Sequence, residues 1–87
     1  MFIVLTYDVN QKRVGKVMKI CRKYLVHVQK SVFDGIITEA KLKSLKGELA
    51  KVIDFDEDAI CVYSTMALHD IRKEQIGTVE KHSCIIG

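Results

Sequence analysis

Apolar residues open the chain in an almost unbroken run and then change to a helical spacing. Met1 to Tyr7 reads M-F-I-V-L-T-Y, a β-branched and aromatic segment typical of a central strand that is buried on both faces. The next segment, Gln11 to Leu25, predicts a helix with Asn10 as its N-cap. Its inward face would hold five apolar side chains: Val14, Val17, Met18, Cys21 and Leu25.

The middle of the chain predicts two more strands and a second helix. Val26 to Thr38 alternates apolar and polar residues with period two, and Asp34-Gly35 inside it is typical of a turn or a bulge. The second helix is predicted from Glu39 to about Ile53, with Thr38 as its N-cap. A further strand is predicted over Ala59 to Ser64.

The last third of the chain has a weaker pattern. Leu68 to Gln75 is compatible with a short helix or a loop, whereas Ile76 to Val79 and Cys84 to Ile86 predict short strand segments. The order βαββαβ followed by a strand-like appendix predicts an α+β, ferredoxin-like sandwich with both helices on one face of an antiparallel sheet. We expect one domain, residues 1–87, with a core over about 1–64 and a dimerisation tail over about 65–87.

Composition narrows the class of protein. The chain has 87 residues, of which 48% are hydrophobic, so it is expected to be globular and to gain from pairing with a second copy. No apolar run approaches the roughly 20 residues of a membrane span, and the start does not resemble a secretion signal. The three cysteines form no C-x-x-C motif and are predicted to be reduced thiols of a cytoplasmic protein.

Charge is distributed very unevenly. Val9 to Phe33 contains seven basic residues and no acid, although the whole chain has a net charge of only +3. On the predicted first helix, four lysines form a stripe opposite the apolar face: Lys12, Lys16, Lys19 and Lys23. Such a stripe is often only the solvated side of a helix, but acids are normally interleaved with it. The stripe of this chain contains no acid, and this favours a polyanionic ligand such as a nucleic acid.

Asp8 has two possible roles. As a carboxylate directly after a buried strand, it can help to start the next helix through the helix dipole. It can also be a metal ligand, because Mg²⁺ takes one or two carboxylates together with water and substrate phosphate. One Asp8 per chain is half of such a site, and a two-fold dimer would supply the other half.

Three other motifs are excluded by their spacing. The run D-F-D-E-D at Asp54 to Asp58 resembles a calcium loop, but Ala59 and Thr65 replace the required Gly and Glu. It is therefore interpreted as a polar turn. His82, Cys84 and Cys61 do not have zinc-site spacing, and no histidine is tied to Ser31 as in a catalytic triad. Phe33 is most often a core residue, although an aromatic beside a basic groove can stack on a base.

Several short motifs together resemble the CRISPR-associated Cas2 family. They are Tyr7-Asp8 at the strand end, K-R-V-x-K-V at Lys12 to Val17, and V-Q-K-S-V-F-D-G at Val28 to Gly35. The last block is the most specific of the three, and the likeness extends from Phe2 to about Tyr63.

This resemblance implies a ferredoxin-like homodimer in which the C-terminal strand can add to the partner's sheet. It implies Mg²⁺, or alternatively Mn²⁺, held between the two copies of Asp8 in an endonuclease for single-stranded RNA or double-stranded DNA. It also implies a part in spacer acquisition with the Cas1 integrase. The family positions that match as catalytic residues are Tyr7, Asp8, Arg13, Ser31 and Phe33.

Nucleic-acid binding would then fall to the basic residues of the first helix: Lys12, Arg13, Lys16, Lys19, Arg22 and Lys23. One position departs from the family, since His27 stands where similar members often carry an Arg, which would make a phosphate contact weaker and pH-dependent. Two alternatives remain open. One is a non-catalytic DNA adaptor of the integrase complex, and the other is a related ferredoxin-like toxin nuclease or small regulatory dimer.

Overall fold

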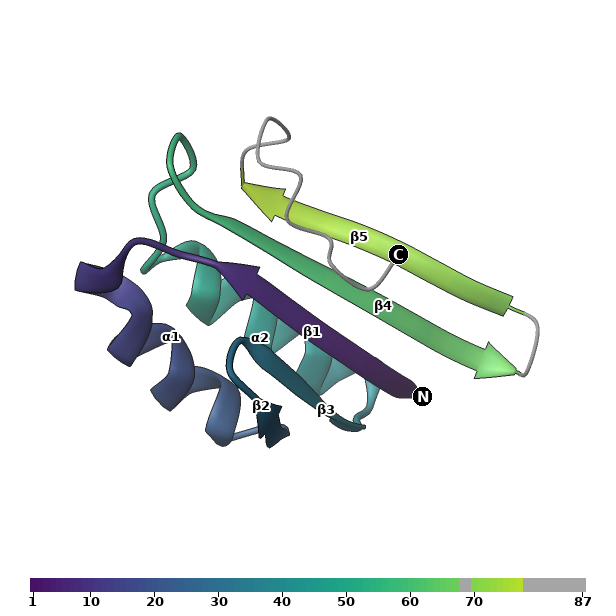
Figure 1. Ribbon diagram of the computed structural model, residues 1–87. Coiled ribbons are helices and arrows are strands. Elements are labelled where there is room, and N and C mark those ends of the chain that lie inside the picture. The colour runs from purple at the N-terminus through teal and green to yellow at the C-terminus, as the bar shows by residue number, and fades with distance from the viewer. Residues whose placement is uncertain (68–69, 78–87) are drawn as a thin grey trace.

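The computed structural model describes residues 1–67 and 70–77 of the chain. Its elements, in order, are β1 (Phe2–Asp8), α1 (Gln11–Arg22), β2 (Val26–Gln29), β3 (Val32–Ile36), α2 (Glu39–Ala50), β4 (Ala59–Ala67) and β5 (Asp70–Gly77). The strands form one antiparallel sheet in the order β2-β3-β1-β4-β5, and both helices cover the same face of it (Figure 1). The predicted α+β, ferredoxin-like sandwich is confirmed, with β1 as the central strand.

The predicted helix caps are also confirmed. The Asn10 side chain accepts a hydrogen bond from the backbone N–H of Lys12, and the Thr38 side chain accepts one from Lys41. These contacts satisfy backbone donors that the first turn of a helix leaves without a partner. Both helices end slightly earlier than predicted, at Arg22 and Ala50.

The core lies between the helices and the sheet. Side chains at alternate positions of β1, including Ile3 and Leu5, pack with residues at helical spacing on α1 and α2. The fully buried members of this cluster are Ile3, Leu5, Val17, Cys21, Phe33, Leu45, Leu49 and Ile60. Burial raises the pKa of the Cys21 thiol to about 12, so this cysteine is a neutral core residue at physiological pH.

Three local predictions need correction. The turn between β2 and β3 lies at Lys30 and Ser31, where Lys30 has a φ of 35°, whereas Asp34-Gly35 lies within β3. Residues 70–75 belong to strand β5 and not to a helix or loop. Cys61 is disulfide-bonded, so the prediction of a reduced thiol is wrong for that residue.

Strand β5 forms because β4 continues to Ala67 and leaves an edge whose backbone groups need partners. Residues 70–77 therefore pair with β4 of their own chain, although their sequence is mostly polar. The predicted strand segments at 78–79 and 84–86 lie outside the described residues, and addition of the tail to a partner's sheet stays a prediction.

Three neighbouring strands, β1, β4 and β5, end or begin together at one margin of the sheet. We call this margin, which runs across the strand ends, the edge of the candidate site. Asp8, the last residue of β1, pairs with Ala59, the first residue of β4, and Ala59 pairs in turn with Gly77 at the end of β5. This edge also carries the connection from β1 into α1 and the end of the acidic turn before β4. The candidate site is built here.

Candidate active site and basic face

The Asp8 side chain is exposed at the end of the central strand. Only Val9 and Asn10 separate Asp8 from the first residue of α1. The carboxylate is thus placed by β1 on one side and by the start of α1 on the other. Within residues 1–67 and 70–77, no group of three or more His, Cys, Asp or Glu side chains could hold a metal ion. One exposed carboxylate is an oxygen ligand of the kind Mg²⁺ prefers.

Ser31 lies beside the same strand end. The backbone N–H of Tyr7 donates a hydrogen bond to the Ser31 carbonyl oxygen at 3.2 Å, which extends the β1–β3 pairing by one residue past Thr6 and Val32. The Ser31 backbone therefore lies against Tyr7, the residue before Asp8, and a catalytic role for Ser31 stays a prediction.

Tyr7 and Phe33, by contrast, lie in the core. Tyr7 is 5% exposed and Phe33 is fully buried, and their ring centroids are 6.2 Å apart. Burial raises the pKa of the Tyr7 phenol, so this group remains protonated at neutral pH. The two rings can support the strand end from below, but Phe33 has no exposed face on which a base could stack.

His27 is engaged with the β2–β3 hairpin. Its ring stacks on Phe33 with centroids 4.7 Å apart, and its Nε2 donates to the Lys30 carbonyl oxygen at 2.7 Å. The His27 side chain thus contacts the backbone of its own hairpin.

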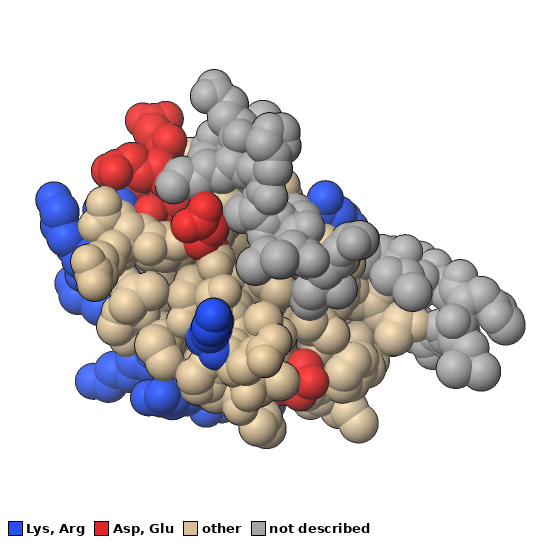
Figure 2. All heavy atoms as spheres, in the orientation of Figure 1, with Lys and Arg blue, Asp and Glu red and all other residues tan. Residues whose placement is uncertain are grey.

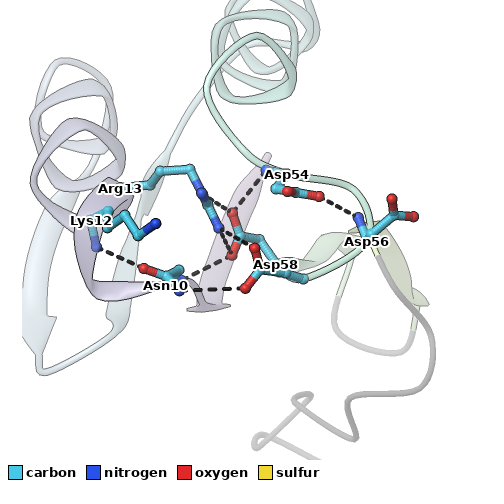
Figure 3. A network of polar contacts seen from close by, with 7 residues as sticks. Asn10, Lys12, Arg13, Asp54, Asp56 and Asp58 are labelled. Atoms are coloured by element: carbon cyan, nitrogen blue, oxygen red, sulfur yellow. Dashed lines mark hydrogen bonds and ion pairs between the residues drawn. The ribbon is translucent and has the colours of Figure 1, made fainter.

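The most extensive polar network at this edge surrounds Asp58 (Figure 3). Arg13 donates to its carboxylate through Nε, 2.6 Å from Oδ2, and through Nη2, 3.1 Å from Oδ1. The backbone N–H groups of Asn10 and Asp54 donate to Oδ1 at 2.9 Å and to Oδ2 at 2.8 Å. A weaker contact joins Arg13 to Glu57 at 3.5 Å. Asp58 therefore receives four hydrogen bonds from two separate parts of the chain.

This network changes the interpretation of Arg13. The sequence predicts that Arg13 contacts a phosphate near the site, but the structure directs two of its N–H donors to Asp58. The Arg13 side chain is 20% exposed to solvent, and the Asp58 side chain is fully buried. Sequence reasoning treated Asp58 as one residue of a polar turn and missed its role in this network. The available signal was its position directly before a buried strand, the same signal that singled out Asp8 directly after one.

The lysines of α1 form a separate surface. Lys12, Lys16 and Lys19 are exposed, as is Arg22, and Lys23 forms an ion pair with Glu48 of α2. Figure 2 shows basic side chains gathered on the α1 side of the molecule, apart from an acidic group near the α2–β4 connection. A shallow hollow within the basic surface is lined by Lys16, Lys19, Ile20, Lys23 and Val52. We refer to Lys12, Lys16, Lys19, Arg22 and Lys23 as the basic face.

Comparison with protein families gives a match over most of the chain. The model of the family described as CRISPR associated protein Cas2 matches residues 1–75. A curated relative from Thermodesulfovibrio yellowstonii, named CRISPR-associated endoribonuclease Cas2 3, is 46% identical over 92% of this chain and 90% of its own. A protein of Dictyoglomus turgidum named CRISPR-associated endoribonuclease Cas2 is 42% identical over 94% of this chain and 93% of its own.

Solved structures give the same result. The crystal structure of Streptococcus pyogenes Cas2 at pH 6.5 matches with a TM-score of 0.69 and 37% identity, over 75% of this chain and 86% of that one. A second structure, described as a crystal structure of cas2, matches with a TM-score of 0.70 and 32% identity, over 83% and 86% of the two chains. Neither helix of the described part is long and apolar enough to cross a membrane.

Proposed function

The chain belongs to the CRISPR-associated Cas2 family, and from this membership we propose that it is a metal-dependent endonuclease of CRISPR immunity that cleaves single-stranded RNA. The observation that carries the proposal is the exposed carboxylate of Asp8 at the end of the central strand, next to a helix whose outer face is basic. The endoribonuclease names of the relatives support RNA as the substrate.

Each part of the edge has a distinct task in this proposal. The basic face binds the phosphate backbone of the nucleic acid through its lysines. Asp8 holds Mg²⁺, or Mn²⁺, together with Asp8 of a second copy in a homodimer. When bound, the ion supplies Lewis acidity, which favours attack on a phosphodiester and neutralises the charge that develops there. Tyr7 and Phe33 keep the strand end rigid from within the core, and the Ser31 carbonyl fixes its backbone.

A homodimer is supported by the sheet face that the helices leave open. Apolar side chains that are exposed in a single chain include Phe2, 42% exposed, and Ile36, 82% exposed. These two residues face each other across β1 and β3 on that open face. A second copy that packs there would bury them and bring two sheets together.

The test compares two acids that differ in location but not in chemistry. We expect Asp8→Asn to lower Mg²⁺-dependent cleavage of single-stranded RNA by at least about 100-fold, because it removes the anionic ligand, while RNA affinity stays nearly unchanged. Asp56→Asn is the matched control, since Asp56 is an exposed acid of the nearby turn. Equal cleavage rates for Asp8→Asn and wild type in highly purified protein would refute the mechanism. A double-stranded DNA substrate in the same assay decides between the two nucleic acids.

A second candidate function is that of a non-catalytic adaptor that clamps duplex DNA between Cas1 integrase dimers. It is favoured by the extent of the basic face, which follows α1 over its 12 residues and about 18 Å of length. The adaptor predicts that Asp8→Ala leaves spacer acquisition intact in cells, whereas reversing the charges of Lys12, Lys16, Lys19 and Lys23 abolishes it.

A further inference from the structure

Asp58 occupies a position from which it can control the geometry of Asp8. In the sheet, Asp8 pairs with Ala59, so Asp58 is the residue next to the pairing partner of Asp8. Two residues past Asp8, the Asn10 N–H donates to Asp58 Oδ1 at 2.9 Å. The segment that carries Asp8 is therefore held on both sides by the same short stretch of chain.

The Asp58 carboxylate also fixes the first turn of α1. Nε and Nη2 of Arg13 bind its two oxygens in a bidentate arrangement, which is more directional than a single contact. Since Asn10 is the N-cap of this helix, the carboxylate holds the cap and the first turn together. A rotation of α1 relative to β1 would have to break these contacts.

The charged form of Asp58 is the form that makes these contacts. Burial alone would raise its pKa, but hydrogen bonds from Arg13 and from the Asp54 and Asn10 N–H groups outweigh it and lower the pKa to about 2. The carboxylate consequently stays ionised throughout the physiological pH range and offers only acceptors to the four donors around it.

The end of β5 packs closely against the backbone of Asp58. A Cβ atom at Gly77 would lie 2.0 Å from the Asp58 carbonyl oxygen, so glycine is required for this close approach. The φ of Gly77, +107°, is also one that other residues rarely adopt. The backbone of Asp58 thus has little freedom to shift.

We propose that Asp58 is a positioning residue for the reaction, which acts through Asn10 and Arg13 to fix the direction in which Asp8 leaves the sheet. This inference rests on the proposed nuclease function, because it assigns to Asp58 the support of the Asp8 carboxylate. If Asp58 served only the stability of the fold, its replacement would lower the unfolding temperature. The molecules that remain folded would then keep the wild-type geometry and activity at Asp8.

The experiment uses Asp58→Asn, which keeps the shape of the side chain but turns one acceptor into a donor that faces other donors. At a temperature where the variant is fully folded, we expect kcat for RNA cleavage to fall about 10- to 100-fold, as for other residues that orient a metal ligand. KM should change less than about twofold, because the basic face is intact. Mn²⁺ affinity, measured by electron paramagnetic resonance, should fall about tenfold. Asp56→Asn, the matched control, should leave all three quantities unchanged.

Folded Asp58→Asn with wild-type kcat and wild-type Mn²⁺ affinity would overturn the proposal. If Asp58→Asn does not fold, Arg13→Lys decides, because it keeps the charge but loses the bidentate contact; wild-type values in that variant would overturn the proposal equally. Failure of the nuclease function is distinguishable, since wild-type protein would then show no cleavage or none that depends on Asp8. Mn²⁺ affinity alone then decides: a loss in Asp58→Asn supports positioning of Asp8, and unchanged affinity or no binding by wild type refutes it.

Discussion

The same helix, α1, carries two positively charged regions that behave in opposite ways. At its start, Arg13 is bound to the buried carboxylate of Asp58 and joins α1 to the turn before β4. We refer to Asp58, Arg13, Asn10 and Gly77 as the junction. Along its outer side, the basic face presents exposed lysines such as Lys16 and Lys19 to solvent.

This difference shows that charge of one sign can serve two purposes within a few residues. In the junction, the cation is compensated by an acid of the same chain, so its main contribution is to structure. On the basic face, Lys23 alone has an acidic partner among the residues that the structure describes, Glu48. Like charges such as those of Lys16 and Lys19 repel one another unless an anion is bound, so their main contribution is expected in binding. Variants of the two regions should therefore affect different measurements.

The largest effect is expected from Asp58→Ala. Removing this carboxylate leaves the donors of Arg13, Asn10 and Asp54 without their acceptor in a buried place, which should lower the free energy of unfolding by about 3 kcal/mol. Chemical denaturation would measure it. Asp56→Ala, in the same turn but exposed, should have almost no effect. Equal stabilities of the two variants would show that the junction does not support the fold.

Two Gly→Ala substitutions, one in the junction and one on α1, should change the stability of the protein in opposite directions. Gly77→Ala should destabilise the protein by more than about 2 kcal/mol, because its Cβ would overlap the Asp58 carbonyl oxygen. A Cβ atom at Gly15, on α1, would meet no atom within 4 Å beyond the backbone of its own helix. Gly15→Ala should therefore stabilise the helix by about 0.5–1 kcal/mol. Thermal unfolding of both variants gives the comparison, and effects of the same sign would contradict it.

The pH dependence of stability tests the junction without changing its shape. The pKa of Asp58 falls from 3.8 to about 2 on folding. Its stabilisation is therefore complete above about pH 4 and is lost as the pH falls towards 2, a change on the order of 2 kcal/mol. The measurement is the difference between the unfolding free energies of wild type and Asp58→Asn over this range. A difference that stays constant between pH 5 and pH 2.5 would argue against the ionised junction.

The basic face should respond in binding and not in stability. Lys16→Gln/Lys19→Gln should weaken binding of single-stranded RNA roughly tenfold at 0.15 M salt and reduce the slope of log affinity against log salt by about 1.4. Unfolding should be unaffected. The control is Lys41→Gln/Lys43→Gln, two exposed lysines of α2. Equal salt slopes for the two double variants would show that the basic face has no special part in binding.

The sequence predicted the elements best where periodicity was strong. The helical spacing of Val17 and Cys21 predicted α1, and the apolar run predicted the central strand β1, because these arrangements bury most of the apolar side chains. Burial of β1 on both faces was not met in the single chain, where Phe2 is 42% exposed. Residues 70–75 of strand β5 were missed because D-I-R-K-E-Q has little apolar content. Its formation depends on the open edge of β4, which local sequence does not reveal.

The candidate site was predicted in part. The placement of Asp8 at a strand end follows from sequence, since an acid directly after a buried strand must lie where the strand leaves the core. The burial of Phe33 agrees with its residue type but not with the alternation, which groups it with His27 and Ser31, whereas Val26 and Val28 are the exposed residues. Neither the pairing of Arg13 with Asp58 nor the hydrogen bond from His27 to the Lys30 carbonyl has a signal in the sequence.

By itself, therefore, the sequence determined the order of elements, the helix caps, the basic face and the strand-end position of Asp8. All of these depend on residues close together in the chain, where spacing and propensity act directly. Only the tertiary structure decided which cations are compensated, among them Arg13 by Asp58 and Lys23 by Glu48. Arg13 and Asp58 are 45 residues apart, and they meet because β4 pairs beside β1 and returns the acidic turn to the start of α1.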